Sequence, residues 1–296
     1  MITRFAPSPT GPLHLGHAYA ALLAYDMAMA SGGTFLLRIE DIDQTRARPK
    51  WDAQICDDLH WLGLSWPEPV MHQSKRQAVY RTALESLWAR GFLYSCTCNR
   101  RDIEAAAAAP QESVNPAFGP DGLIYPGTCR PVDPPIGDMP DGVALRLNMA
   151  RAVAECDELH FTETGAGPDG QTGRIGFTRQ SAIGSLGDVV LARRDMGTSY
   201  HLSVVLDDAD QGITHVTRGQ DLFEATQIHV ILQRLLGLPT PVYHHHRLIR
   251  DENGKRLAKR DDARAIAQYR EDGATPQDIR QLVGISASSC QKILKG

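Results

Sequence analysis

Residues 4–17 read RFAPSPTGPLHLGH and lead into an apolar segment, about residues 18–29, that is predicted to be a helix. The loop places His14 and His17 at the head of this helix, where free backbone N–H groups and a partial positive charge favour a phosphate. Gly16 lets the backbone approach a bulky ligand, and the imidazoles supply donors for charge that develops on a phosphoryl group. The stretch therefore predicts a phosphate-binding loop.

The residues that follow alternate between strand and helix patterns. Residues 34–39, TFLLRI, are predicted to form a buried strand, and helical patterns follow at about 49–62 and 74–90. This alternation predicts an α/β fold with a Rossmann-type, doubly wound parallel sheet. Ligands bind at the carboxyl ends of the strands in such sheets, so we expect Glu40, at the end of the predicted strand, to lie near the N-terminal loop.

The composition changes between about residues 94 and 190, where Pro and Gly are frequent. We interpret this stretch as an α+β insertion between two halves of the nucleotide-binding fold. The predicted domains are residues 1–93 (first half), 94–190 (insertion), 191–262 (second half) and 263–296 (short helical tail). Further predictions are strands near 143–147 and 188–193, helices near 222–236 and 263–271, and a helix start at Thr275-Pro276.

Three of the six cysteines, Cys96, Cys98 and Cys129, lie in the predicted insertion. Thiolates bind zinc tightly, but a tetrahedral structural site needs four ligands, so the cysteines leave one position open. A histidine would be the expected fourth ligand, and none lies near in the sequence. The alternative is three buried thiols without a metal. The remaining cysteines are interpreted as ordinary core or surface residues: Cys56, Cys156 and Cys290.

Two other polar clusters have plainer interpretations. Adjacent residues on a strand point to opposite faces, so His244, His245 and His246 cannot all bind one metal without a bend. We expect strand or loop packing for them, with ATP or RNA contact as the alternative. The acidic run at residues 207–210 could bind Mg²⁺ in isolation, but we expect it to cap or brace the loop before Thr214.

Composition limits the class of protein. The chain has 296 residues, 42% of them hydrophobic, and a net charge of −4, which fits a protein with a large core and excludes one that coats nucleic acid nonspecifically. No long apolar run and no secretion signal is evident, so we expect a cytoplasmic enzyme that is not bound to a membrane. In that setting cysteines are expected as thiols or metal ligands rather than disulfides.

A second motif lies far away in the sequence. Residues 254–261 read GKRLAKRD. Together with residues 4–17 they resemble the two signature motifs of class I aminoacyl-tRNA synthetases, HIGH and KMSKS, in the form of the glutamyl branch. The register places Lys259 on the second lysine of KMSKS, which meets the ATP triphosphate. Arg256 keeps the charge of the first lysine, whereas Ala258 lacks the hydroxyl of the usual serine.

This resemblance implies the substrate contacts. Glutamate binding is implied for Arg4, Phe5, Ala6, Pro7, Ser8, Glu40, Tyr200 and Arg218, and ATP binding, with Mg²⁺, for His14, Gly16, His17, Arg256 and Lys259. His14, His17 and Lys259 are the implied catalytic residues. Arginine suits the carboxylate of the substrate, and Glu40 suits its ammonium. The spacing Cys-x-Cys…Tyr-x-x-x-Cys also resembles a zinc site of some glutamyl-type synthetases, which implies one structural Zn²⁺ with Tyr125 as the fourth ligand.

Only 37 residues follow Lys259, which is too few for the anticodon-binding region of ordinary glutamyl-tRNA synthetases. The whole chain resembles the truncated bacterial paralogues of those enzymes. This resemblance implies ATP-dependent activation of L-glutamate without tRNA, then its transfer to queuosine at the wobble position of the tRNA(Asp) anticodon, by a monomer. The alternatives are a compact glutamyl-tRNA synthetase that charges the 3′ end of tRNA(Glu), a generic nucleotidyltransferase, and a non-catalytic, synthetase-like RNA-binding protein.

Overall fold

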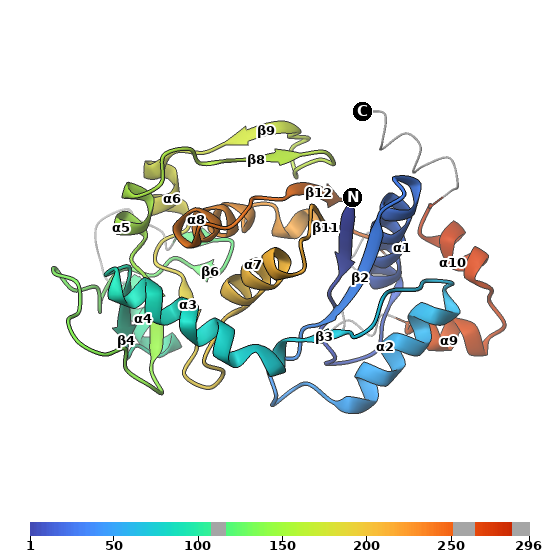
Figure 1. Ribbon diagram of the computed structural model, residues 1–296, viewed down its shortest axis with the longest axis horizontal. Helices are drawn as coiled ribbons and strands as arrows, with labels where there is room; N and C mark the ends of the chain where they lie inside the picture. The colour runs from blue at the N-terminus through green and yellow to red at the C-terminus, as the bar shows by residue number, and fades with distance from the viewer. Residues whose placement is uncertain (108–116, 251–263, 286–296) are drawn as a thin grey trace.

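The computed structural model describes residues 1–107, 117–250 and 264–285 (Figure 1). The motif at residues 254–261, with Arg256 and Lys259, lies outside the described residues, and so does Cys290. The roles given to these residues therefore stay predictions.

A three-stranded parallel sheet forms the N-terminal part of the fold. Its strands, in spatial order, are β1 (Ile2–Phe5), β2 (Thr34–Ile39) and β3 (Met71–His72). Helix α1 (Leu15–Ala30) connects β1 to β2, and α2 (Pro49–Trp61) connects β2 to β3. Helix α3 (Gln77–Ala89) follows β3 after the 3₁₀ turn Gln73–Arg76. The predicted strand at 34–39 is confirmed. Helix α1 begins three residues before its predicted start because His14 serves as its N-cap.

A second sheet, of four strands, lies in the C-terminal half of the fold. Its order is β11 (His215–Gly219), β12 (Val242–His246), β8 (His160–Glu163) and β9 (Gly173–Gly176). The first three strands are parallel, and β9, which lies in the range predicted as an α+β insertion, adds antiparallel to β8. The connection between β8 and β9 is too short for the crossover that a parallel pair requires.

The two sheets meet between β1 and β11. Backbone N–H groups of Thr34, Thr214 and Val242 donate to the carbonyls of Met1 (2.9 Å), Ile2 (3.0 Å) and Thr214 (3.0 Å), respectively. The starts of β1, β2, β11 and β12 therefore lie together, and their carboxyl ends meet at the opposite edge. Helix α7 (Tyr200–Asp210) precedes β11, and α8 (Thr226–Leu236) connects β11 to β12.

An antiparallel sheet forms most of the predicted insertion. Its strands are β10 (Val190–Ala192), β7 (Ala144–Leu147) and β4 (Leu93–Cys96), accompanied by α4 (Arg100–Ala107), α5 (Met149–Ala154), α6 (Arg179–Ser185) and the small hairpin β5 (Phe118–Gly119) and β6 (Gly122–Leu123). The predicted strands near 143–147 and 188–193 are confirmed with shorter ends. β8 and β9 also fall in the range 94–190, yet they pair with the second half of the fold.

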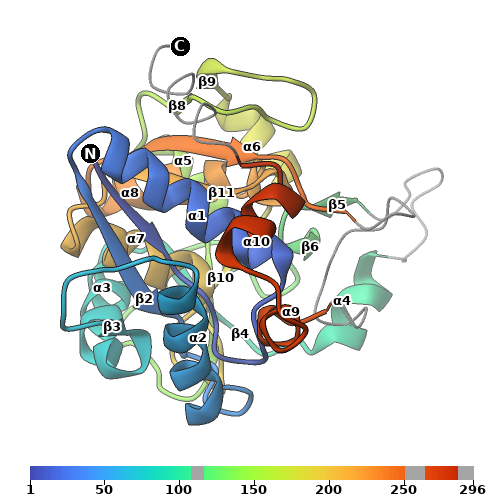
Figure 2. The same cartoon turned by 90° about the vertical axis from the view of Figure 1, so that its right-hand side faces the viewer.

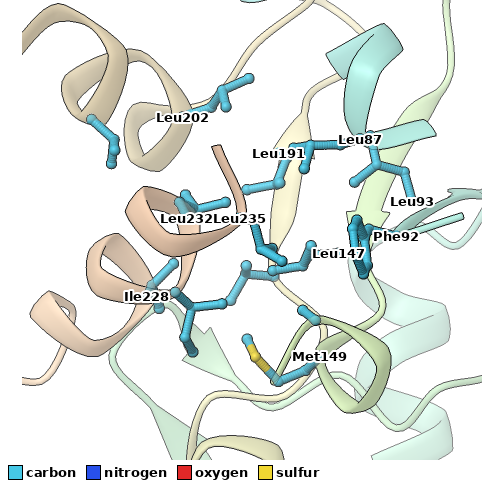
Figure 3. Close-up of a cluster of buried hydrophobic side chains, with 14 of the residues drawn as sticks. Leu87, Phe92, Leu93, Leu147, Met149, Leu191, Leu202, Ile228, Leu232 and Leu235 are labelled. Carbon is cyan, nitrogen blue, oxygen red and sulfur yellow. The ribbon is translucent and has the colours of Figure 1, made fainter. Parts of the chain in front are cut away.

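The largest hydrophobic cluster joins this antiparallel sheet to the C-terminal half. Leu147 and Leu191 from the sheet meet Leu232 and Ile228 from α8, and all four side chains are buried (Figure 3). Burial of each such side chain contributes about 1.5–3 kcal/mol. Apolar packing therefore holds the insertion against the nucleotide-binding fold.

The short C-terminal helices pack on the N-terminal half. These are α9 (Ile266–Glu271) and α10 (Pro276–Leu282), and Figure 2 shows them beside α2 and α1. Thr275 caps α10 in a reciprocal capping box, as the Thr-Pro pair predicts, and Arg280 bonds Asp26 of α1 (2.7 Å). Ile266 and Ile279 are fully buried. Within the described ranges, no helix has the length and apolarity that a membrane span requires.

Candidate active site and metal centre

His14 and His17 cap the start of α1 reciprocally. Nδ1 of His14 accepts from the backbone N–H of Gly16 (3.1 Å), and Nδ1 of His17 accepts from that of His14 (3.2 Å). Each neutral ring therefore carries its proton on Nε2. A Cβ at position 16 would lie 3.0 Å from the His14 ring, so glycine allows the close approach of this ring without a shift.

A cavity of about 380 Å³ lies at the carboxyl ends of β1 and β11. Nine of the residues implied to bind glutamate or ATP line it: Arg4, Phe5, Ala6, His14, Gly16, His17, Glu40, Tyr200 and Arg218. Ser8 instead lines a neighbouring cavity of about 610 Å³, which shares Glu40 and Tyr200 with the first. Pro7 lines neither cavity, but its carbonyl accepts from the backbone N–H of Glu40 (3.0 Å) and so fixes the end of β2.

Arg4 is paired within the protein. Its Nε donates to Asp208 (2.9 Å) and its Nη1 to the carbonyl of Thr217 (3.3 Å). Asp208 also accepts from Arg38 (2.7 Å), which in turn donates to Glu40 (3.2 Å). The four side chains form one buried chain of alternating charge that holds Glu40 at the cavity wall.

The pKa shifts follow from this burial. Burial raises the pKa of the Glu40 carboxyl, although the Arg38 and Arg4 guanidiniums oppose the rise. Burial also acts to raise the pKa of Asp208, but Arg4 and Arg38 outweigh it and leave that pKa below its ordinary value. Asp208 therefore stays ionised, while the proton affinity of Glu40 is higher than that of an ordinary glutamate.

The acidic run at 207–210 lies in α7, and its carboxylates bind other side chains. Its backbone carbonyls bind the loop before Thr214, because Asp208 and Ala209 accept from the N–H groups of Ile213 (2.8 Å) and Gly212 (3.0 Å). Asp207 accepts from Arg76 (2.6 Å), Gln73 (2.8 Å) and Tyr80 (2.8 Å), and ties α3 to α7. The run therefore braces this loop through its backbone, as predicted, and its carboxylates additionally connect α7 to neighbouring elements. Sequence reasoning missed Arg38 altogether, although a lone arginine within the apolar strand TFLLRI was the available signal.

Arg218 differs from Arg4 in having neutral partners. Its three nitrogens donate to His245 Nε2 (3.0 Å), His229 Nδ1 (3.0 Å) and Thr226 Oγ1 (2.6 Å). Across the described ranges, no carboxylate lies within ion-pair distance of this guanidinium. A buried cation at the wall of a cavity, with no carboxylate in ion-pair distance among the described residues, is suited by its charge to an anionic group.

The three consecutive histidines of β12 are buried, as strand packing predicts. His244 contacts the Thr164 hydroxyl (3.1 Å) on one face, while His245 contacts Glu163 and Arg218 on the other. His246 lines the first cavity and contacts the Tyr19 ring edge-on. The three residues do not converge on a common point.

The predicted zinc ligands come together in the insertion. The sulfurs of Cys96, Cys98 and Cys129 lie within 4.8 Å of one another, and the Tyr125 hydroxyl lies 3.5 Å from each of the first two. Ligands about 2.3 Å from a tetrahedral zinc are about 3.8 Å apart, so the donor set fits the metal. The Tyr125 hydrogen bond lowers the pKa of Cys129 to about 6, which favours the thiolate that zinc binds, whereas burial raises the pKa of the Tyr125 phenol.

Comparison with known proteins identifies the family to which the chain belongs. The family model for class I tRNA synthetases (E and Q), catalytic domain, matches residues 1–117 and 162–295. The glutamyl-Q tRNA(Asp) synthetase of Rhodobacter capsulatus is 64% identical over 96% of this chain and 100% of its own length. The chain belongs to the glutamyl-Q tRNA(Asp) synthetase family.

Another member of this glutamyl-Q family, from Symbiobacterium thermophilum, is 40% identical over 93% of this chain and 83% of its own length. Among solved structures, a glutamate tRNA ligase from Elizabethkingia meningosepticum, in complex with its amino acid, is 25% identical with a TM-score of 0.70. The glutamate-tRNA synthetase of Elizabethkingia anophelis gives 25% and 0.71. This chain spans about 60% of the length of those two proteins. The class I synthetase core and its α/β fold are thereby established.

Proposed function

We propose that this protein activates L-glutamate with ATP, without tRNA, and then transfers the glutamyl group to queuosine at the wobble position of the tRNA(Asp) anticodon. The observation that carries this proposal is the match over the whole length of a relative named glutamyl-Q tRNA(Asp) synthetase. The charges of the first cavity support the choice of amino acid.

Glutamate offers two carboxylates and one ammonium. We assign its side-chain carboxylate to Arg218, whose charge has no counter-ion among the described residues, and its ammonium to Glu40. Tyr200 lies at the same wall, and its contact with glutamate is proposed with those of residues 4–8. The charge of Arg4 is matched by Asp208, so we give Arg4 the smaller part of the binding energy.

In the activation step an oxygen of the α-carboxylate attacks the α-phosphorus of ATP. The bond from that phosphorus to the bridging oxygen of pyrophosphate breaks, and glutamyl-adenylate forms. The Nε2–H groups of His14 and His17, with the start of α1, would stabilise charge on the α-phosphate. Mg²⁺ bound to ATP would neutralise part of the triphosphate charge, and Arg256 and Lys259 are proposed to contact the same phosphates.

In the transfer step a hydroxyl of the RNA attacks the carbonyl carbon of the mixed anhydride and releases AMP. The second cavity shares Glu40 and Tyr200 with the first, so a group held there lies next to the activated carbonyl. We assign the modified nucleoside to this second cavity. Its volume of about 610 Å³ is in the range of small-molecule sites.

We also infer one structural zinc ion, held by Cys96, Cys98, Cys129 and Tyr125. The closeness of three sulfurs and one phenol oxygen supports this inference. A zinc in that position would cross-link β4 to the segment that carries Cys129, and it would take no part in the chemistry of the cavity.

The activation step is tested by ATP–pyrophosphate exchange without any RNA. We expect exchange with L-glutamate and at least tenfold less with L-glutamine or L-aspartate, because neither presents a carboxylate at the distance of Arg218. Exchange that requires added tRNA would contradict the proposed activation. Equal exchange with glutamine would contradict the assignment of Arg218.

A compact glutamyl-tRNA synthetase is the second candidate. The similarity in fold to glutamate tRNA ligases over 96% of this chain favours it. Both candidates share the activation step, so the acceptor RNA distinguishes them.

A further inference from the structure

The partners of Arg218 belong to two chains of hydrogen bonds that leave the glutamate cavity in different directions. In the first, Arg218 Nε donates to Nε2 of His245, whose Nδ1 contacts the carboxylate of Glu163. Glu163 also accepts from the backbone N–H groups of His245 (2.8 Å) and Gly165 (2.7 Å). The carboxylate therefore keeps the His245 proton on Nδ1 and leaves Nε2 as an acceptor for the guanidinium.

The second chain is longer. Arg218 Nη1 donates to Nδ1 of His229, so a neutral His229 carries its proton on Nε2. That Nε2 lies 3.1 Å from Nδ1 of His201, and His201 Nε2 lies 3.4 Å from the carboxylate of Asp121 in the β5–β6 hairpin. The two hydrogen bonds from Arg218 to His229 and from His229 to His201 are both satisfied when the two imidazoles are neutral. Asp121 and His201 also line the second cavity.

The electrostatics of the site agree with neutral imidazoles. Burial, reinforced by Arg218, holds the pKa of His229 well below its ordinary value. Burial likewise lowers the pKa of His245, although the hydrogen bond with Glu163 opposes this. Neither ring adds charge or removes charge at the guanidinium, in contrast to Asp208, which neutralises Arg4.

We propose that His229 and His245 are positioning residues that determine specificity for glutamate. As neutral acceptors they fix the guanidinium of Arg218 without cancelling its charge, so the full charge is available to the side-chain carboxylate of the substrate. Glu163 holds the required tautomer of His245, and His201 holds that of His229 by accepting from its Nε2–H. This inference rests on the proposed function only in taking glutamate as the ligand of Arg218.

The test compares two substitutions of nearly equal shape, His229→Asp and His229→Asn. Both place an oxygen where Nδ1 now accepts from Arg218, but only the aspartate carries a charge. We expect KM for glutamate in pyrophosphate exchange to be about tenfold or more higher in H229D than in H229N, because the charge-assisted contact with substrate is lost. KM for ATP should change less than twofold in both, and the preference for glutamate over glutamine should fall in H229D.

The control is His244→Asn, on the same strand as His245. His244 is buried, as His229 is, but it contacts Thr164 on the opposite face of the strand from His245. Its replacement should therefore leave KM for glutamate within twofold of the wild-type value. If H229D does not fold, His201→Phe tests the same chain by removing the acceptor of the His229 Nε2–H group. We expect a smaller rise in KM for glutamate and none in KM for ATP.

Glutamate binding is followed separately, by the rise in melting temperature that glutamate gives without ATP. Equal KM and equal melting shifts in H229D and H229N, with active wild type, would overturn the role of the neutral histidines and leave the proposed function intact. A wild type without exchange and without a glutamate-dependent shift would overturn both.

Discussion

Glu40 is the residue on which binding of the substrate ammonium depends in this account. Glu40→Gln removes that charge while Arg38 keeps Asp208 and Gln211 as partners. We expect KM for glutamate to rise about 10- to 100-fold, the range for a hydrogen bond to a charged group. Burial raises the pKa of Glu40, so in the wild type kcat/KM should fall with decreasing pH above the range of ordinary carboxyls.

The pH profile of exchange separates this role from a structural one. The acidic fall in kcat/KM should be absent or moved to lower pH in E40Q, because the group that takes up the proton is gone. An unchanged acidic limb in E40Q would show that another group is responsible for it.

Tyr125 is the least usual member of the proposed zinc site, and Tyr125→Phe isolates its hydroxyl. The phenylalanine ring keeps the packing under the Arg146 guanidinium, 3.8 Å from the ring centre. We expect Y125F to lose zinc at a chelator concentration about tenfold below that which strips the wild type. Metal content after dialysis measures this. Cys156→Ser, at a buried cysteine outside the cluster, should retain zinc like the wild type.

Some residues of the candidate site could be predicted from the sequence, and others could not. His14, Glu40 and Arg218 were identified from motifs, and the structure brings them to one cavity. Arg38, His229 and Glu163 were missed, because each acts through another side chain that only the fold places beside it. No local pattern around His229 distinguishes it from an ordinary core histidine of α8.

At the scale of elements, α2 carries a buried carboxyl that opposes folding. Asp58 is 1% exposed, its Oδ2 has no hydrogen-bond partner, and burial with the nearby Asp57 raises its pKa to about 6. A carboxyl whose folded pKa is raised costs stability as pH rises from its unfolded value of 3.8 to about 6, and the cost is constant above that.

Asp58→Asn should therefore stabilise the protein at neutral pH. We expect a gain of up to about 3 kcal/mol in the free energy of unfolding at pH 8, from the shift of about two pKa units, and less than half of it at pH 4.5. Urea unfolding at the two pH values measures both. Asp57→Asn, at an exposed neighbour that pairs with Arg270, should change stability by about 0.5 kcal/mol or less. A pH-independent effect of D58N would contradict the linkage.

Elements with strong periodicity were predictable and short ones were not. The strand at 34–39 and the cap at Thr275 follow from local chemistry. β3, β5 and β6 have two residues each, so their conformation depends on partners far away in the chain. The placement of β8 and β9 likewise depends on the pairing of β8 with β12, far away in the chain, and local sequence does not specify that pairing.

At the scale of the whole molecule, the two cavities and the two hydrogen-bond chains connect parts that are distant in sequence. Glu40 from the first half, Arg218 from the second half and Asp121 from the predicted insertion meet around adjoining spaces. The family match omits residues 118–161, which include the β5–β6 hairpin and β7.

Labelling of three tRNAs with radioactive glutamate identifies the RNA that accepts the glutamyl group. The pure protein is incubated with ATP and radiolabelled L-glutamate, together with tRNA(Asp) that contains queuosine, the same tRNA without queuosine, or tRNA(Glu). The account predicts label on the queuosine-containing tRNA(Asp) alone. Label on tRNA(Glu), or equal label on tRNA(Asp) with and without queuosine, would contradict it.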